Sequence, residues 1–215
     1  TLGGGVDPGT PAVVRTGVQP HGITLSGATL NSGAGNISLR GSGLAGGSTQ
    51  VGISFGGSVV QSTSGTITIV GAGGPGTDNN WGLNISNGAV STTITSSGGA
   101  IAITGTGGAG STSNNYGVYM QAGSVVEYTG SGTGTQLQIT GTGPAGATGS
   151  NHGLRINAST VRTTQTGDIV ISGTTSGSGG NNFGVTLDNA ATITSTQSTA
   201  GVGRITIIGA STGGA

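Results

Sequence analysis

The heptad NNWGLNI, Asn79–Ile85, contains the only tryptophan of the 215-residue chain, and variants of it return at a regular spacing. Each variant keeps a ring, a glycine directly after the ring, and apolar residues one and three positions beyond the glycine: NNYGVYM at 114–120, SNHGLRI at 150–156 and NNFGVTL at 181–187. With the glycine as position zero, the chain contains six units of 30–36 residues, which begin near Gly22, Gly52, Gly82, Gly117, Gly153 and Gly184. Self-similarity of this length predicts an array of stacked repeats.

Apolar residues alternate with other residues in three places in each unit. They occur just after the zero glycine, near position eight, and in a later triplet, apolar-x-apolar-x-Gly, which ends at Gly41, Gly71, Gly105, Gly141, Gly173 and Gly209. Alternation with period two is typical of strands, and no stretch shows helical periodicity. We therefore expect three short strands in each unit, the second of them around position eight: Leu30, Val60, Val90, Val125, Val161 and Thr192.

A unit of three short strands cannot bury its own apolar face, but parallel stacking of such units can. The sequence therefore predicts an all-β fold, a right-handed parallel β-helix (β-solenoid) with about six rungs over residues 22–215. At roughly 4.8 Å per rung, six rungs span on the order of 30 Å. We expect insertions between the second and third strands at Thr93–Gly99, Gly130–Gln136 and Ser195–Gly203. Residues 1–21 are a Gly/Pro-rich segment with one irregular strand, a cap or an inter-subunit strand: Ala12, Val13, Val14, Arg15 and Thr16.

The ring before the glycine has the same parity as the apolar residues after it, so we expect it to point inward. Successive rungs then stack a structural column of rings: Trp81, Tyr116, His152 and Phe183. A carbohydrate-binding row is the alternative interpretation of these rings. The residue before each ring is predicted to form an asparagine ladder between rungs: Asn80, Asn115, Asn151 and Asn182. Tyr119, two positions after its glycine, is predicted to face outward, where it is available to a partner or a sugar.

Composition excludes several classes of function. The chain has no cysteine, so disulfides and thiolate metal sites are absent, and its five basic residues balance five acidic ones. This neutrality provides no electrostatic footprint for nucleic acid or anionic lipid, and no apolar run approaches transmembrane length. We expect no cofactor, no bound metal and no membrane insertion. Residues 1–3 do not begin a signal peptide, so for an exported protein we expect the targeting segment to lie outside this chain.

Catalysis and ice binding are the less favoured alternatives. Polysaccharide cleavage needs carboxylates gathered on one face, and the five acidic residues share no column of the predicted solenoid: Asp7, Asp78, Glu127, Asp168 and Asp188. The chain is therefore not expected to be an enzyme. An ice-binding face needs a ladder of Thr-x-Thr pairs, and the outward pair of the third strand is Thr-x-Thr in one unit of six, at Thr66 and Thr68.

Third-strand motifs such as GTITIVG, Gly65–Gly71, and GDIVISG, Gly167–Gly173, resemble the repeats of large bacterial surface proteins. The families that they resemble are the filamentous-haemagglutinin-like adhesins and the autotransporter passenger domains, and the resemblance covers roughly residues 22–209. It implies export, a right-handed β-helix, and a role in adhesion, biofilm or fibre formation. The units here are longer than the haemagglutinin repeat, and the amino-terminal secretion domain of that family is not visible.

These observations predict a structural β-solenoid subunit of an extracellular bacterial fibre or cell-surface stalk. No polar cap follows Gly209, so its expected partner is itself, in a head-to-tail homopolymer, or further repeats of a longer parent chain. In a homopolymer, the strand at Ala12–Thr16 would complete a rung of the neighbouring copy. The alternative is a segment of a large secreted adhesin that binds glycans or host and biofilm surfaces.

Overall fold

The computed structural model describes residues 2–3, 20–86, 90–197 and 202–213 of the chain. Within these residues every regular element is a strand, and the strands form three parallel sheets, named A, B and C. In each rung the chain passes from sheet B to sheet C and then to sheet A. The predicted β-solenoid of about six rungs is therefore confirmed. None of the described residues forms a helix that is long and apolar enough to cross a membrane.

Sheet A has seven strands, sheets B and C have six each, and all neighbours pair in parallel. The strands of sheet A are β1 Leu2–Gly3, β4 Ile37–Ser42, β7 Ile67–Ala72, β10 Ile101–Thr106, β13 Thr135–Ala145, β16 Asp168–Ser176 and β19 Ile205–Ser211. Those of sheet B are β2 Ile23–Ser26, β5 Ile53–Gly56, β8 Leu83–Ile85, β11 Val118–Met120, β14 Leu154–Asn157 and β17 Val185–Asp188. Those of sheet C are β3 Thr29–Asn31, β6 Val59–Ser62, β9 Thr93–Ser96, β12 Val125–Tyr128, β15 Thr160–Thr163 and β18 Thr192–Ser195.

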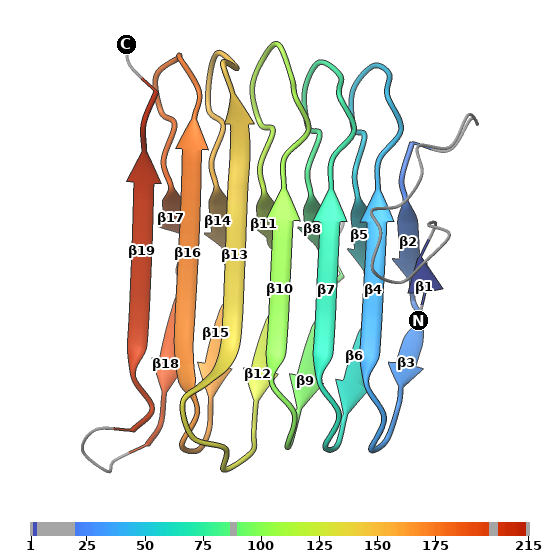
Figure 1. The fold of residues 1–215 in the computed structure, drawn as a ribbon, viewed down its shortest axis with the longest axis vertical. Coiled ribbons are helices and arrows are strands. Elements are labelled where there is room, and N and C mark those ends of the chain that lie inside the picture. Colours follow the sequence, from blue (N-terminus) through green and yellow to red (C-terminus); the bar gives the residue numbers. More distant parts are fainter. Residues whose placement is uncertain (1, 4–19, 87–89, 198–201, 214–215) are drawn as a thin grey trace.

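Sheet A forms one side of the molecule, and sheets B and C lie behind its upper and lower halves (Figure 1). The longest dimension of the structure runs along the strands of sheet A, vertically in Figure 1, whereas the rungs stack from one side of the view to the other. The stack of six rungs is therefore shorter along its stacking axis than across it, along the strands of sheet A. A slender fibre built from this fold would need many more rungs.

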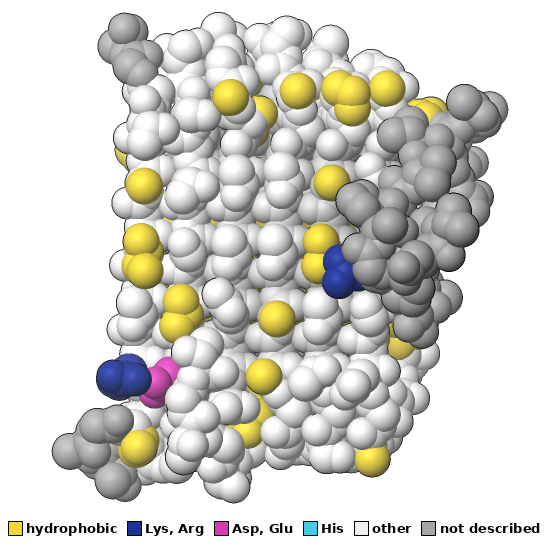
Figure 2. All heavy atoms as spheres, viewed as in Figure 1, with side chains coloured by type: hydrophobic (Ala, Val, Ile, Leu, Met, Phe, Trp, Pro, Cys, Tyr) yellow, Lys and Arg dark blue, Asp and Glu magenta, His cyan; other side chains and the backbone are white. Residues whose placement is uncertain are grey.

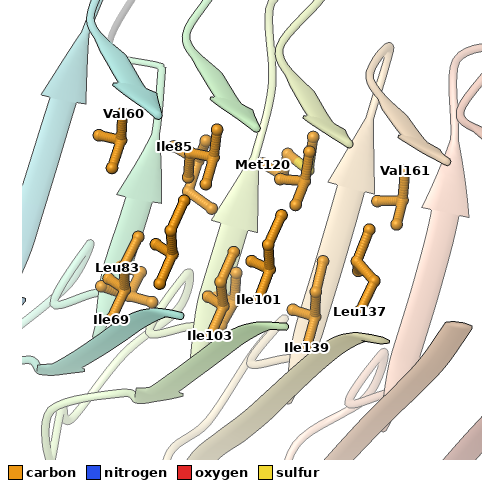
Figure 3. Packing of buried hydrophobic residues seen from close by; sticks show 14 of the residues in the cluster. Val60, Ile69, Leu83, Ile85, Ile101, Ile103, Met120, Leu137, Ile139 and Val161 are labelled. Atoms are coloured by element: carbon orange, nitrogen blue, oxygen red, sulfur yellow. The ribbon is translucent and has the colours of Figure 1, made fainter. Parts of the chain in front are cut away.

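The core is a set of continuous apolar columns that run through the rungs. The glycine-terminated triplets of sheet A stand in register; for example, Ile69 pairs with Ile103, and Ile103 pairs with Ile139. Side chains of sheets A, B and C meet between the sheets, where those of rungs two to five are almost fully buried (Figure 3). Each rung therefore contributes apolar area that only its two neighbours can cover, as in other solenoids.

The second strand does not always centre on position eight, as its sequence pattern predicts. It does so in rungs one, two and five, but in the other rungs the residue that stands in the inward column comes later: Ile94, Val126 and Ile193. Val90, the residue predicted for rung three, is 60% exposed and lies outside any strand. The position-eight rule fails here because the corner between sheets B and C differs in length between rungs.

The variable length of the corner between sheets B and C also shows that one insertion was predicted at the wrong place. In rung three the extra residues lie between β8 and β9, not between β9 and β10. Thr93–Gly99, where the insertion was predicted, begins with β9 itself. In rungs four and six, longer connections do precede β13 and β19, as the sequence predicts.

The corner between sheet A and the next strand of sheet B is a thin seam where two backbone segments lie against each other. The zero glycine sits in this seam in every rung: a Cβ on Gly117 would overlap the backbone of Thr142, Gly105 and Gly153. Gly82 and Gly153 are enclosed in the same way by equivalent backbone atoms. The repeated glycine is therefore required by close approach of backbone rather than by an unusual φ angle.

The outer face of sheet A is almost free of charge in its centre, and charged side chains appear only toward its margins (Figure 2). Further outward positions lie on either side of the triplet glycine, where rungs three and four carry Thr-x-Thr pairs: Thr104 with Thr106, and Thr140 with Thr142. The first column of this array is interrupted by Arg40 and Val70 in earlier rungs and by Ile208 in rung six. The threonine pairs therefore do not form a ladder along the whole sheet.

The amino end of sheet A carries one additional strand. β1 pairs in parallel with β4, with Leu2 opposite Leu39, so that sheet A extends one strand beyond rung one. The strand predicted at Ala12–Thr16 lies outside the described residues.

Candidate functional site: an outer ring cluster, an asparagine ladder and an open end

The rings at the position before the glycine do not join the apolar core between the sheets, where the sequence predicts them. Tyr116 and His152 are nevertheless buried, at 2% and 5% exposure, against neighbouring rings, whereas Phe183 is 51% exposed. The ring of Trp81 meets the ring of Tyr119 edge to face, with centroids 5.4 Å apart, and Tyr116 meets Tyr119 at the same distance. Tyr119 faces outward, because its neighbours Val118 and Met120 are fully buried in the core. The chain bends at the zero glycine, so the alternation of inward and outward residues restarts there and cannot be counted across it.

Three of the four rings stack from rung to rung. The centroids of Tyr116 and His152 are 5.0 Å apart with an interplanar angle of 14°, and those of His152 and Phe183 are 5.5 Å apart at 22°. Trp81 instead contacts Tyr119, which the sequence pattern places apart from the predicted ring column. We refer to Trp81, Tyr116, Tyr119, His152 and Phe183 as the ring cluster.

Polar groups fix the ring cluster in place. The guanidinium of Arg155 lies over the rings of Tyr116 and Tyr119, at 5.9 and 5.5 Å from their centroids, and donates to the Tyr116 hydroxyl at 3.3 Å. The same guanidinium forms an ion pair with Asp188 of the next rung at 2.7 Å. The indole N–H of Trp81 donates to the carbonyl oxygen of Asn114 at 2.6 Å. The cluster therefore combines cation–π, ring and hydrogen-bond contacts across four rungs.

Burial keeps the imidazole of His152 neutral. Burial and, secondarily, the positive charge of Arg155 lower the pKa of His152 from 6.5 to about 4. The neutral ring accepts a hydrogen bond at Nδ1 from the backbone N–H of Phe183, at 3.2 Å. Burial also raises the pKa of Tyr116. Neither group is poised to exchange a proton near neutral pH, which is consistent with a packing role.

The predicted asparagine residues line the inside of the seam and form a one-way ladder. Each side-chain Oδ1 accepts the backbone N–H of the corresponding residue one rung earlier, at distances of 2.8–3.0 Å: Gln50 to Asn80, Asn80 to Asn115, Asn115 to Asn151, and Asn151 to Asn182. A bond between side chains, the kind that the sequence predicts, joins Asn115 Nδ2 to Asn151 Oδ1 at 3.2 Å. All four asparagines are buried. The ladder therefore supplies acceptors to backbone groups that water cannot reach.

The first asparagine of each NN pair has a different task. Asn79, Asn114 and Asn181 adopt the left-handed conformation, with φ of 57°, 64° and 61°. Asparagine tolerates this region better than most residues, which explains why it precedes the ladder position. In rung five the left-handed residue is Gly149, with φ of 87°, one position earlier.

The two ends of the stack differ. In rung six the inward side chains of β19 are uncovered: Ile207 is 45% exposed and Ile205 42%, whereas Leu39 and Ile37, at the equivalent positions of rung one, are 1% and 8% exposed. The strands β17, β18 and β19 are also the edges of their sheets, so their outer N–H and C=O groups face no further strand among the described residues. We call this surface the open face.

The acidic residues beyond position 100 are each paired with an arginine on an adjacent rung. Besides Arg155 with Asp188, the pairs are Arg162 with Glu127 at 2.7 Å and Arg204 with Asp168 at 2.9 Å. The hydrogen bonds from Arg204 lower the pKa of Asp168. In the described part of the chain no group of three or more His, Cys, Asp or Glu side chains could hold a metal ion.

No family model, curated protein or solved structure matches this chain. The function proposed below therefore rests on its own sequence and geometry.

Proposed function

We propose that the protein is a structural section of an extracellular bacterial fibre or surface stalk, extended at its open face by another parallel rung. The observation that supports this most is the difference between the ends, because the apolar columns of sheet A are covered at rung one and uncovered at rung six. Large exposed apolar areas of this kind mark interaction surfaces. The added rung is supplied by further repeats of the parent chain or by a second copy stacked end to end.

The direct test is to give the chain a seventh rung. Because Thr175 pairs with Ser211, a second copy of residues 176–211 joined after Ser211 continues the solenoid in register. We expect this extension to raise the free energy of unfolding by about 3 kcal/mol, since it buries several half-exposed apolar side chains. Urea unfolding and hydrogen exchange of the β19 amides measure the effect.

A pair of substitutions on one strand provides the control. Ile207→Asp in β19 places a carboxylate in the inward column and should remove the gain, whereas Ile208→Asp, which pairs outward with Ser172, should keep it. If the extension leaves the β19 amides exchanging at their original rate, the proposal is wrong. Electron microscopy of the original chain separates the two sources of the rung, because long uniform filaments require stacked copies.

A second candidate, adhesion through neutral glycans, is favoured by the solvent-exposed members of the ring cluster, Trp81, Tyr119 and Phe183. Trp81 and Tyr119 are half-buried, and two partly exposed amide side chains lie near them: Gln121 and Asn157. Rings beside amides suit the apolar faces and hydroxyls of sugars, and the pairing of Arg155 with Asp188 leaves little net charge. Against it, Tyr116 and His152 are stacked on each other and are only 2% and 5% exposed, so they offer little surface to a sugar.

If glycans bind this surface, Tyr119→Ala should weaken binding at least about tenfold, which corresponds to about 1.4 kcal/mol. Retention on immobilised neutral polysaccharides measures this. The matched control is Thr24→Ala, which changes the equivalent outward position in rung one. Equal retention of both variants, or no retention of the original chain, would remove this candidate.

A further inference from the structure

We infer that the open face selects for a rung that carries asparagine in the ladder position, and that it rejects the first rung of a second copy. This inference rests on the proposed function, in which another rung covers the open face. It follows from the direction of the ladder, in which each rung depends on the asparagine of the rung after it.

The pattern holds at every junction where a backbone N–H has to be satisfied. Rungs two to five each present a buried N–H at the ladder position, and each finds the Oδ1 of an asparagine in the following rung. Asn182 presents the same N–H in rung six, and among the described residues this N–H has no acceptor. Asn182 is itself buried at 8% exposure, so a covered open face would leave its N–H without water as well.

At the amino end of the stack, the ladder position has no backbone N–H and therefore needs no acceptor in the next rung. Pro20 occupies the ladder position of rung one and has no N–H. The corresponding residue of rung two is Gln50, not asparagine, and its Oε1 has no hydrogen-bond partner, while its Nε2 donates to the carbonyl of Ser48. The absence of a donor in rung one thus coincides with the absence of a ladder acceptor in rung two. The first bond of the ladder therefore starts at the N–H of Gln50, and the N–H of Asn182 has no acceptor among the described residues.

A second copy cannot continue this ladder with its first rung. Proline has no side-chain acceptor, so Pro20 stacked on Asn182 would leave a buried N–H unpaired. At rung one, sheet A is also already extended by β1, which pairs with β4. The position before the zero glycine does not require a ring, because Val51 occupies it in rung two and β5 still pairs with β2 in register. Asparagine is therefore the group that identifies a matching rung.

The test uses the full chain extended by the second copy of residues 176–211, with substitutions in the appended rung only. One version keeps the asparagine that corresponds to Asn182, a second carries Asn182→Ala, and a third carries Asn182→Pro to imitate rung one. The readout is the hydrogen-exchange rate of the original Asn182 amide, measured by NMR, beside the rates of the β19 amides. A matched control is Ser178→Ala in the appended rung, which changes an exposed side chain of the same loop.

With the asparagine retained, we expect slow exchange at both places. With alanine or proline, the β19 amides should stay protected, while the Asn182 amide should exchange at least about tenfold faster. Equal protection of the Asn182 amide in all versions would overturn the selectivity. Loss of protection of β19 in every version would instead contradict the proposed function. Filaments of the original chain whose axial repeat is one chain would also overturn the inference, because they require rung one to stack on rung six.

Discussion

Replacing Gly117 by alanine is expected to destabilise the protein by about 3–5 kcal/mol, a large effect for the addition of a single methyl group. The added Cβ would overlap backbone atoms of Thr142, Gly105 and Gly153, and none of these can move without opening the seam between sheets A and B. Backbone on three sides distinguishes this site from a glycine that faces a flexible side chain. Urea unfolding followed by circular dichroism measures the loss.

The matched control for this prediction is Gly47→Ala. Gly47 also lies in a connection between sheets A and B, but a Cβ there meets no atom within 4 Å and its φ is not in the left-handed region. The substitution should be neutral or slightly stabilising, because alanine restricts the unfolded chain. If Gly117→Ala were as mild as Gly47→Ala, the close approach of the two backbones would not be what the zero glycine is needed for.

Asn151→Ala is expected to cost about 3 kcal/mol, because it removes an acceptor from a buried N–H and several further hydrogen bonds. Its Oδ1 accepts from the N–H of Asn115, and its Nδ2 donates to the carbonyls of Thr112, Thr148 and Gly149 at 3.0–3.2 Å. The damage should appear one rung earlier than the substitution, as faster hydrogen exchange of the Asn115 amide.

Asn36→Ala provides the comparison for the ladder. Asn36 also accepts a backbone N–H from a neighbouring rung, that of Thr66 at 2.8 Å, but it is exposed. Water replaces the lost acceptor there, so the cost should stay below about 1 kcal/mol. Similar losses for the two variants would show that burial of the ladder contributes nothing to its strength.

Sequence alone predicted the fold because its strongest signals are local and repeated. The triplets that end at Gly71 and Gly105, for example, stand in the register that their spacing implies. Alternation reports which face a residue occupies only while the strand is straight. That condition holds within each triplet, and the three sheets therefore follow from the pattern of residues.

The ring cluster could not be placed correctly for the same reason. Trp81 and Leu83 are two positions apart but lie on either side of the bend at Gly82, so equal parity no longer means equal direction. The insertion in rung three was misplaced because Val90 and Ile94 both fit an apolar column, and only pairing with Val60 decides between them. The NN pairs were the missed signal: an asparagine in the left-handed region before a buried asparagine marks a sharp corner.

Because the ladder runs in one direction, it also implies the order in which the rungs of the solenoid complete their hydrogen bonds during folding. A chain that emerges amino end first, from a ribosome or through an export channel, would expose each rung before the asparagine that completes it has arrived. The rung that emerged last would still lack the acceptor for its ladder N–H. Hydrogen bonding would therefore be complete only up to the rung before it. Growth at the carboxyl end would then be vectorial, with each new asparagine completing the hydrogen bonds of the turn before its own.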